Sequence, residues 1–472
     1  MSGIFGVLSK KDCRRTLFYG TDYHSHLGTK KAGLAVFNRG ISRCIHDIST
    51  SQFKSKFIEE ISKLKGKKGI GVISDFDSQP VIISCSFGNF ALVTAGLLRN
   101  KNSLARSIMK VGGSFSEMSG GEINTTEIIG KLIARKDNVI SGIEYMFEQI
   151  KGSVSLLVLS KEGIYAARDK SGRTTLVIGR NKNSLVVTSE TCALPNLGFK
   201  PIKEFKPGEI VFFNENGLKS KKVVGKENKL CSFLWIYTGY PASSYENINV
   251  EMVRERCGAN LAKRDKIKAD LVTGVPDSGI AHAIGYAKKS KIPYGRPLVK
   301  YTDGYGRSYT PPSQEIRSRI AKLKLIPIGS VIEGKRIVVC DDSIVRGTQL
   351  KNQAIEKLWK NKAKEIHVRI ACPPLMFPCP YLLSTRTKRE LAARRIIRKL
   401  MGKKKIDIEQ FLDDKSPSYK RMVEAIRKEL KVTSLSYQTV DDMVEAIGLP
   451  KDRLCLYCWI GKNNSSKTKD KE

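Results

Sequence analysis

Long hydrophobic runs are missing from this chain. No apolar stretch approaches the roughly 20 residues that a helix needs to span a bilayer, and the mixed stretch around Lys10 and Lys11 contains no signal-peptide core. The sequence therefore predicts a cytoplasmic protein without a membrane segment. Apolar residues make up 41% and aromatic residues 8% of the 472 residues, which suits globular packing and disfavours wholesale disorder.

Acidic residues are scarce beside basic ones. The chain has 83 lysines and arginines against 46 aspartates and glutamates, which gives a formal net charge of +37. Such a surplus favours polyanionic partners, from nucleotide phosphates to RNA. A general lysine bias on solvated surfaces is the alternative, because the basic residues lie along most of the chain. The densest run, 394–405, is the best candidate for a nucleic-acid patch.

A disulfide framework is disfavoured, because the eleven cysteines are an odd number and no secretory signal precedes them. Most of them lie in apolar segments and are expected to be small core residues. Cys455 and Cys458 differ because they form a CxxC pair near the C-terminus. That spacing alone is equally compatible with metal binding and with redox chemistry.

Two patterns of secondary structure divide the chain. Up to about residue 225, short apolar runs alternate with turns, which predicts a mainly antiparallel sheet; helical stretches near 125–135 and 143–150 make this part α+β. After about residue 245, ADLVTGVPDSG, GKRIVVCDDS and EIHVRIACP have the appearance of strands in a parallel α/β sheet. We expect three parts: 1–230, 231–382, and a mostly helical extension, 383–472.

Two loops at predicted strand ends carry residues suited to a phosphorylated ligand. In RIVVCDDSIVRGT, residues 336–348, an apolar strand is followed by two carboxylates and a loop with Ser, Gly and Thr ahead of a helix. Hydroxyls and backbone amides at a helix start cradle phosphate, and the paired acids suit a ribose diol or magnesium. GVPDSG, residues 274–279, has the same construction. Both loops are expected at the ligand-binding edge of the sheet.

The order and spacing of these strings resemble the glutamine phosphoribosylpyrophosphate (PRPP) amidotransferase family over nearly the whole chain. The two loops, GRSYTPPSQEIRSRIAKLKLIPI, the N-terminal GIFGV and the C-terminal LCLYCWIGK carry the resemblance, with an apparent insertion around 400–420. It implies an Ntn-hydrolase-like sandwich followed by an α/β type I phosphoribosyltransferase domain with a parallel sheet. The implied activity makes 5-phosphoribosylamine and pyrophosphate from PRPP, the first step of purine synthesis. A homotetramer is also implied.

The resemblance assigns roles to individual residues. Mg²⁺ is expected on Ser278, Asp341 and Asp342. Arg307 is expected in a mobile flap that closes over PRPP and excludes water from an oxocarbenium-like C1. The string GYGRSYTPPSQ keeps Arg307 and Gln314 but departs from the commoner pattern between them. The residues expected to bind PRPP are Asp277, Ser278, Gly279, Asp341, Asp342, Ser343, Ile344, Val345, Arg346, Gly347 and Thr348.

Four cysteines match positions at which a subgroup of the family holds a 4Fe-4S cluster. Their contexts are LCSFLWIY, FPCPY and LCLYC. Thiolates are suitable soft ligands for iron, and Zn²⁺ on the same cysteines is the main alternative. We expect a structural role in which the C-terminal segment is fastened to the rest of the chain. The four residues are Cys231, Cys379, Cys455 and Cys458.

The chain departs from the family pattern at the glutaminase site. The family's N-terminal cysteine nucleophile corresponds to Ser2, which would offer a hydroxyl instead of a thiol. The arginine for the glutamine carboxylate corresponds to Ser74, the oxyanion-hole asparagine to Ala95, and the aspartate for the α-amino group to Thr125. Loss of one oxyanion donor alone costs about a hundred- to a thousand-fold in rate. The sequence therefore predicts an inactive glutaminase and a transferase that uses free ammonia or ammonia from another protein.

Two further functions stay open at this stage. One is a catalytically degenerate subunit that senses PRPP or nucleotides beside an active paralogue. The other is an RNA-associated protein on the same fold, supported by the net charge and the basic run 394–405. The intact phosphate loops favour the transferase or the sensor, because a scaffold for RNA alone has no need of DDSIVRGT.

Overall fold

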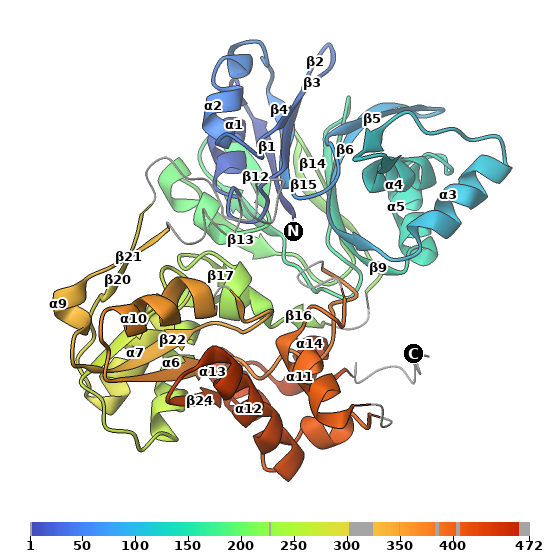
Figure 1. Cartoon of the computed structure of the whole chain (residues 1–472). Helices are drawn as coiled ribbons and strands as arrows, with labels where there is room; N and C mark the ends of the chain where they lie inside the picture. The colour runs from blue at the N-terminus through green and yellow to red at the C-terminus, as the bar shows by residue number, and fades with distance from the viewer. Residues whose placement is uncertain are drawn as a thin grey trace. The chain divides into compact units, whose positions relative to one another are not determined.

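The computed structural model describes residues 2–225, 228–301, 324–348, 350–382, 387–402 and 406–461. They form two compact units (Figure 1). Among these residues, no helix is long and apolar enough to cross a membrane. Unit 1 comprises Met1–Leu230, Ala242–Glu246 and Pro380–Leu383, and unit 2 comprises Cys231–Pro241, Asn247–Cys379 and Ser384–Glu472.

Unit 1 is built on two antiparallel sheets. The larger has the strand order β13-β11-β12-β1-β4-β2-β3 and the smaller β15-β14-β10-β9-β6-β5. Because side chains alternate along a strand, β1 feeds two cores: Ile4 and Leu8 pack between the sheets, whereas Phe5 and Val7 pack on the opposite face. The strands of the larger sheet are β1 (Ser2–Ser9), β2 (Lys31–Asn38), β3 (Gly40–Asp47), β4 (Lys68–Ser74), β11 (Val177–Arg180), β12 (Ser184–Thr188) and β13 (Lys200–Glu204), and those of the smaller are β5 (Val81–Cys85), β6 (Gly88–Leu98), β9 (Gly152–Ser160), β10 (Ile164–Ala167), β14 (Glu209–Asn214) and β15 (Gly217–Val223).

Helices cover the outer faces of both sheets. α1 (Arg14–Asp22) and α2 (Phe53–Phe57) share a core with the larger sheet, and α3 (Lys101–Lys110), α4 and α5 share one with the smaller. The predicted helices near 125–135 and 143–150 are confirmed as α4 (Thr125–Ile133) and α5 (Val139–Gln149). Unit 1 is therefore a four-layer α/β/β/α sandwich, which confirms the expected fold class.

Unit 2 contains a parallel sheet with the strand order β19-β22-β23-β24. The three strands predicted from the apolar runs are confirmed as β19 (Leu271–Gly274), β22 (Arg336–Asp341) and β23 (Glu365–Ile370). The fourth, β24 (Ser434–Tyr437), comes from the segment after residue 383 and pairs with β23. The helices include α6 (Val250–Lys263), α7 (Ile280–Ser290), α9 (Gly329–Ile332), a π-helix (Leu350–Ile355) leading into α10 (Glu356–Lys360), α11 (Ala392–Met401), α12 (Pro417–Leu430), α13 (Val440–Ile447) and α14 (Tyr457–Ile460).

Short pairings complete unit 2. β20 (Leu298–Lys300) and β21 (Leu325–Pro327) form an antiparallel pair. β16 (Leu230–Cys231) pairs with β25 (Leu454–Cys455), so a cysteine near the start of unit 2 lies beside one near its end. In the parallel sheet, the carboxyl ends of β19 and β22 lie side by side, because Gly274 is in register with Cys340. The two predicted phosphate loops therefore leave the same edge.

Candidate functional site

The two strand-end loops of unit 2 meet through their side chains. β22 ends at Asp341, whose Oδ1 accepts a hydrogen bond from the Ser278 hydroxyl at 2.9 Å and from the Asp342 backbone N–H at 3.0 Å. The Ser343 hydroxyl donates to the Asp342 carboxylate. The structure therefore brings Ser278, Asp341 and Asp342 together, the three residues that the sequence predicts for magnesium.

Both carboxyls are buried, with 7% of Asp341 and 5% of Asp342 exposed. Burial raises the pKa of Asp341 well above its usual range, and the adjacent Asp342 charge adds to the effect. Burial also raises the pKa of Asp342, against the hydrogen bond from Ser343. Two adjacent carboxyl groups that are shielded from water can bind a hard cation or the hydroxyls of a ribose.

The close approach of the two loops depends on Gly279. A Cβ placed on this residue would lie 2.2 Å from the Cys340 carbonyl oxygen, which no real Cβ contact allows. The neighbouring Val275 N–H donates to that same oxygen at 2.9 Å. Glycine thus lets the loop that carries Asp277 and Ser278 rest directly on the end of β22. Lys300 on β20 donates to the Asp277 carboxylate.

The loop 343–348 presents backbone N–H groups. Gly347 has φ +82°, a left-handed conformation that glycine adopts without strain. Within the described part of the chain, none of the backbone N–H groups of 343–348 donates to a described backbone carbonyl. Consecutive free amides around a left-handed residue form an anion-binding concavity. Ile344 is buried, whereas Arg346 and Thr348 are exposed.

The residues of the predicted flap are not among those that the structure describes. Arg307 and Gln314 fall between residues 302 and 323, which lie outside the described residues. The predicted role of Arg307 is therefore an expectation from the sequence only.

In unit 1 the structure brings Ser2 and Ser74 together as partners in the β1–β4 pairing. The Ser2 hydroxyl donates to the Ser74 oxygen at 3.2 Å, and the Phe76 backbone N–H donates to the same oxygen at 3.1 Å. Ser74 is buried, and Ala95 is a buried residue of β6. The neighbourhood of Ser2 thus holds the short hydroxyl group of Ser74, the position at which the resemblance predicts an arginine in the family.

Thr125, the first residue of α4, is engaged by a carboxylate from its own unit. Asp77 accepts hydrogen bonds from the Thr125 backbone N–H and hydroxyl, whereas the Thr126 backbone N–H donates to the side-chain oxygen of Asn124 at 2.9 Å. Burial raises the pKa of Asp77, and these hydrogen bonds partly offset that rise. The start of α4 therefore interacts with an internal acid. Asp77 carries no sequence signal of this role, because its partner Thr125 is 48 positions away and no local pattern marks it.

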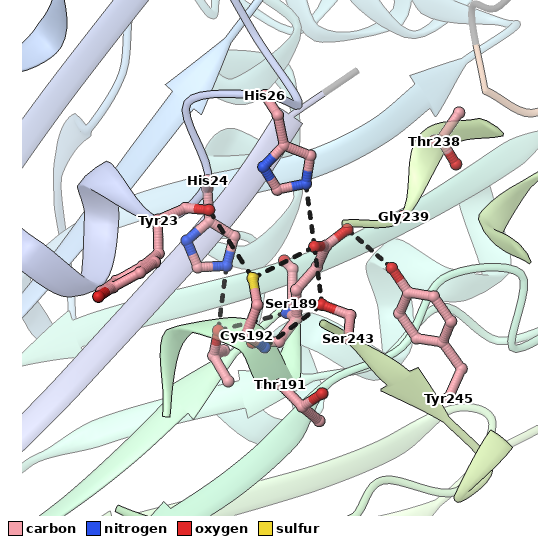
Figure 2. Close-up of polar contacts among 12 residues, drawn as sticks. Tyr23, His24, His26, Ser189, Thr191, Cys192, Thr238, Gly239, Ser243 and Tyr245 are labelled. Atoms are coloured by element: carbon pink, nitrogen blue, oxygen red, sulfur yellow. Dashed lines mark hydrogen bonds and ion pairs between the residues drawn. The ribbon is translucent and has the colours of Figure 1, made fainter. Parts of the chain in front are cut away.

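A second carboxylate of unit 1 is almost fully buried. Glu190, which follows β12, accepts from the Tyr245 hydroxyl at 2.7 Å and from the Ser243 hydroxyl at 3.0 Å, and it lies 2.9 Å from the Nε2 of His26 (Figure 2). Burial alone would raise its pKa, but the charge and hydrogen bond of His26 and the Tyr245 hydroxyl lower it to about 2. Glu190 is thus an ionised anchor that fastens segment 242–246 to the sandwich.

His24 lies beside this anchor and stays neutral. Burial lowers its pKa to about 4, although the Glu190 carboxylate opposes that shift. Its Nδ1 is 2.8 Å from the Gly20 carbonyl and its Nε2 is 3.0 Å from the Thr188 hydroxyl. The string VTSETCALPNLG contains Glu190 but gives no sign of its burial, because the partners come from distant segments.

The four predicted cluster cysteines gather in unit 2. The Ser232 hydroxyl next to Cys231 donates to the Cys455 carbonyl at 3.2 Å, and the Phe377 N–H, two residues before Cys379, donates to the Cys458 carbonyl at 3.0 Å. A hydrogen bond with Cys379 raises the pKa of the Cys458 thiol, as do burial and the nearby Cys231 and Cys455. Among the described residues, however, no three Cys, His, Asp or Glu side chains converge as a ready set of ligands for one metal ion.

Comparison with known proteins identifies first the class and then the family. Residues 69–196 match the glutamine amidotransferase domain family, which defines the class of unit 1. The whole chain belongs to the amidophosphoribosyltransferase family. It is 32% identical over 493 residues to the amidophosphoribosyltransferase of Methanocaldococcus jannaschii, a match that covers 98% of this chain and 97% of that protein.

A bacterial relative and its solved structure indicate the same family. The Bacillus subtilis amidophosphoribosyltransferase is 32% identical over 479 residues, covering 98% of this chain and 93% of that protein. The solved structure of glutamine PRPP amidotransferase from B. subtilis, complexed with ADP and GMP, matches with a TM-score of 0.85 at 31% identity, covering 100% of this chain and 99% of that chain. The resemblance inferred from the motifs is therefore confirmed.

Proposed function

We propose that this chain is a phosphoribosyltransferase that forms 5-phosphoribosylamine and pyrophosphate from PRPP, uses ammonia and does not hydrolyse glutamine. The observation that carries the proposal is the convergence of Ser278, Asp341 and Asp342 beside a loop of free amides at one edge of the parallel sheet. Membership of the amidophosphoribosyltransferase family supports the same activity and its place at the start of purine synthesis.

The roles of the residues follow from their chemistry. Asp341 and Asp342 hold the ribose hydroxyls, and residues 343–348 hold the 5-phosphate through backbone amides and the hydroxyls of Ser343 and Thr348. Asp277, Ser278 and Gly279 orient the pyrophosphate. The nitrogen of ammonia then forms a bond to C1 as the bond from C1 to the pyrophosphate oxygen breaks. The leaving oxygen keeps the electron pair, and the ammonium nitrogen releases a proton to solvent.

Magnesium fits the donor set, since the partly buried Ser278 hydroxyl and the two buried carboxylates are oxygen ligands. Ser278, Asp341 and Asp342 would hold it. When bound, the ion offsets negative charge on the leaving pyrophosphate. The cation would also stabilise the ionised forms of the two aspartates, whose burial otherwise disfavours charge.

The inactive glutaminase is supported by the contacts in unit 1. A glutamine carboxylate needs a cationic or multiply donating partner, and the buried Ser74 already accepts from Ser2 and Phe76. Thr125 donates to Asp77 and offers no charge to an α-ammonium group. With Ala95 in the oxyanion position, the site lacks a side-chain donor there.

A 4Fe-4S cluster on Cys231, Cys379, Cys455 and Cys458 is part of the proposal, with Zn²⁺ as the competing occupant. Each cysteine of a cluster binds a different iron, so its sulfurs stand farther apart than those around one ion. What supports the proposal is the grouping of the four thiols in unit 2, where Cys379, Cys231 and Cys455 together raise the pKa of Cys458. Iron and acid-labile sulfide analysis of the purified protein, beside zinc analysis, decides between the two.

The remaining assignments extend this function. We assign 1–230 to an inactive amidotransferase domain, 231–382 to the transferase domain and 383–472 to a C-terminal extension that completes the cysteine site. A homotetramer is expected from the family, and an active paralogue or another protein is a candidate ammonia donor. Nucleic-acid binding by 394–405 stays a prediction.

The test measures pyrophosphate release by purified protein with PRPP and Mg²⁺, supplied with either ammonium chloride or glutamine. We expect release with ammonium and none with glutamine, and loss of release in Asp342→Asn. Glutamine-driven release would refute the inactive glutaminase. PRPP binding without turnover would instead indicate a sensing subunit, and salt-sensitive RNA binding without PRPP affinity would indicate the RNA-associated function.

A further inference from the structure

The phosphate loop 343–348 is fixed from outside by the C-terminal segment. The Ala392 N–H, at the start of α11, donates to the Val345 carbonyl at 2.7 Å. One turn later, Arg395 donates from Nη2 to the Arg346 carbonyl at 3.2 Å. Arg346 in turn donates to the Glu390 carboxylate just before the helix. Two consecutive loop carbonyls thus point at α11.

Those two carbonyls determine where the following amides point. In a planar trans peptide the C=O and the next residue's N–H point in opposite directions. With the Val345 and Arg346 carbonyls held by α11, the N–H groups of Arg346 and Gly347 face away from that helix. The left-handed φ of Gly347 then sets the direction of the next peptide, which carries the Thr348 N–H, relative to these two groups. The outer contacts therefore set up the inner, anion-binding face of the loop.

Arg395 is itself held in place by a counter-ion. Its Nη1 and Nη2 lie 2.7 and 2.6 Å from Oε1 of Glu429, in the last turn of α12. Lys399, one turn further along α11, lies 3.5 Å from the other oxygen of that carboxylate. About a third of each of Arg395 and Glu429 is exposed, so the pair is only partly shielded by protein. The planar guanidinium can meet the carboxylate and the carbonyl together, which an ammonium does less well.

We infer that Arg395, oriented by Glu429, is a positioning residue for the 5-phosphate of the sugar substrate. It touches no substrate; it holds the Arg346 carbonyl so that the Gly347 N–H stays directed at the phosphate. The inference deepens the proposed function and rests on it. It also gives Arg395, one residue of the basic run 394–405, a role within unit 2.

The test separates the two ends of PRPP. Ribose 5-phosphate carries only the 5-phosphate, and pyrophosphate carries only the leaving group, which the proposed function assigns to 277–279. Binding of each, with Mg²⁺, is measured by calorimetry on the full chain. In Arg395→Met we expect the Kd for ribose 5-phosphate to rise about tenfold, the scale of one hydrogen bond from a charged group, with the pyrophosphate Kd unchanged. KM for PRPP should rise more than kcat falls.

Matched variants control for folding and for charge. Arg398→Met removes the same charge from the same helix without touching the loop, and should leave both affinities as they are. Arg395→Lys should recover part of the ribose 5-phosphate affinity, and Glu429→Gln should weaken it mildly while keeping Arg395 present. Equal weakening of both ligands in Arg395→Met, or no weakening, would overturn the inference. Failure of the wild-type chain to bind either ligand would overturn the proposed function and this inference with it.

Discussion

Glu190 and Asp341 illustrate how the surroundings of a buried carboxylate decide its charge. Glu190 receives His26 and the Tyr245 hydroxyl, which lower its pKa to about 2 in spite of burial. Asp341 has a second acid beside it, and its pKa rises. The first arrangement suits a permanent structural anchor. The second suits a site where a cation or a sugar supplies the missing partner.

The pKa of Glu190 predicts acid sensitivity of unit 1. The pKa is lower in the folded chain than the roughly 4.3 of an unfolded glutamate, so the folded state gains stability above that value. This gain is lost as pH falls from about 4.3 towards 2. Glu190→Gln should destabilise unit 1 at neutral pH by about 3 kcal/mol, because His26 loses its partner, and should flatten the acid dependence in that window.

Two optical probes check this expectation. All three tryptophans, Trp235, Trp359 and Trp459, lie in unit 2, so their fluorescence follows that unit, whereas far-UV circular dichroism follows both. Urea unfolding of Glu190→Gln should shift the dichroism transition and leave the fluorescence transition in place. Glu117→Gln, which breaks a surface pair with Arg43, should cost less than about 1 kcal/mol. A Glu190→Gln transition identical to that of the wild type would contradict the anchor.

At the scale of elements, the site depends on two strand ends being adjacent. The β19–β22 register places Gly274 beside Cys340, and Gly279 lets the next loop settle on that carbonyl. Neither strand alone would make a site. The combination explains why the acids at the end of β22 meet a serine from another loop.

Gly279→Ala should separate these loops. The new methyl group would meet backbone, not a flexible side chain, at 2.2 Å, so the loop with Ser278 has to move away from Asp341. We expect PRPP affinity to fall at least about tenfold while the circular dichroism spectrum is kept. Gly40→Ala, at a position with open space around it, is the matched control. Unchanged PRPP binding in Gly279→Ala would show that the loop contact is dispensable.

Local sequence patterns predicted the strands and the loops at their ends, but they did not predict contacts between distant segments. The acids of 341–342 and Gly347 in the following loop are close in sequence, so a strand ending in DDSIVRGT already indicates that these residues lie near one another. The contact of Tyr245 with Glu190 spans 55 residues, and that of Arg395 with Arg346 spans 49. Such pairs depend on how whole elements pack, which a single sequence pattern does not encode.

For the whole molecule, the proposed function makes the two units respond differently to ligands. A ligand stabilises the folded state that binds it, by about 2.7 kcal/mol when present at a hundred times its Kd. PRPP with Mg²⁺ should therefore raise the melting midpoint reported by the tryptophans of unit 2. Glutamine should leave the melting curve from circular dichroism, which includes unit 1, unchanged. A clear stabilisation by glutamine would contradict the loss of its binding site.

The contacts between the phosphate-loop carbonyls and α11 also predict a pattern of amide hydrogen exchange in the loop. Because the Arg346 and Gly347 amides have no described backbone acceptor, they should exchange with deuterium quickly in the free protein although α11 holds the peptides that carry them. Ribose 5-phosphate should slow exchange at these positions and leave the core amides of β22 as slow as before. The loop would then behave as a rigid surface whose protons exchange freely until a phosphate covers them.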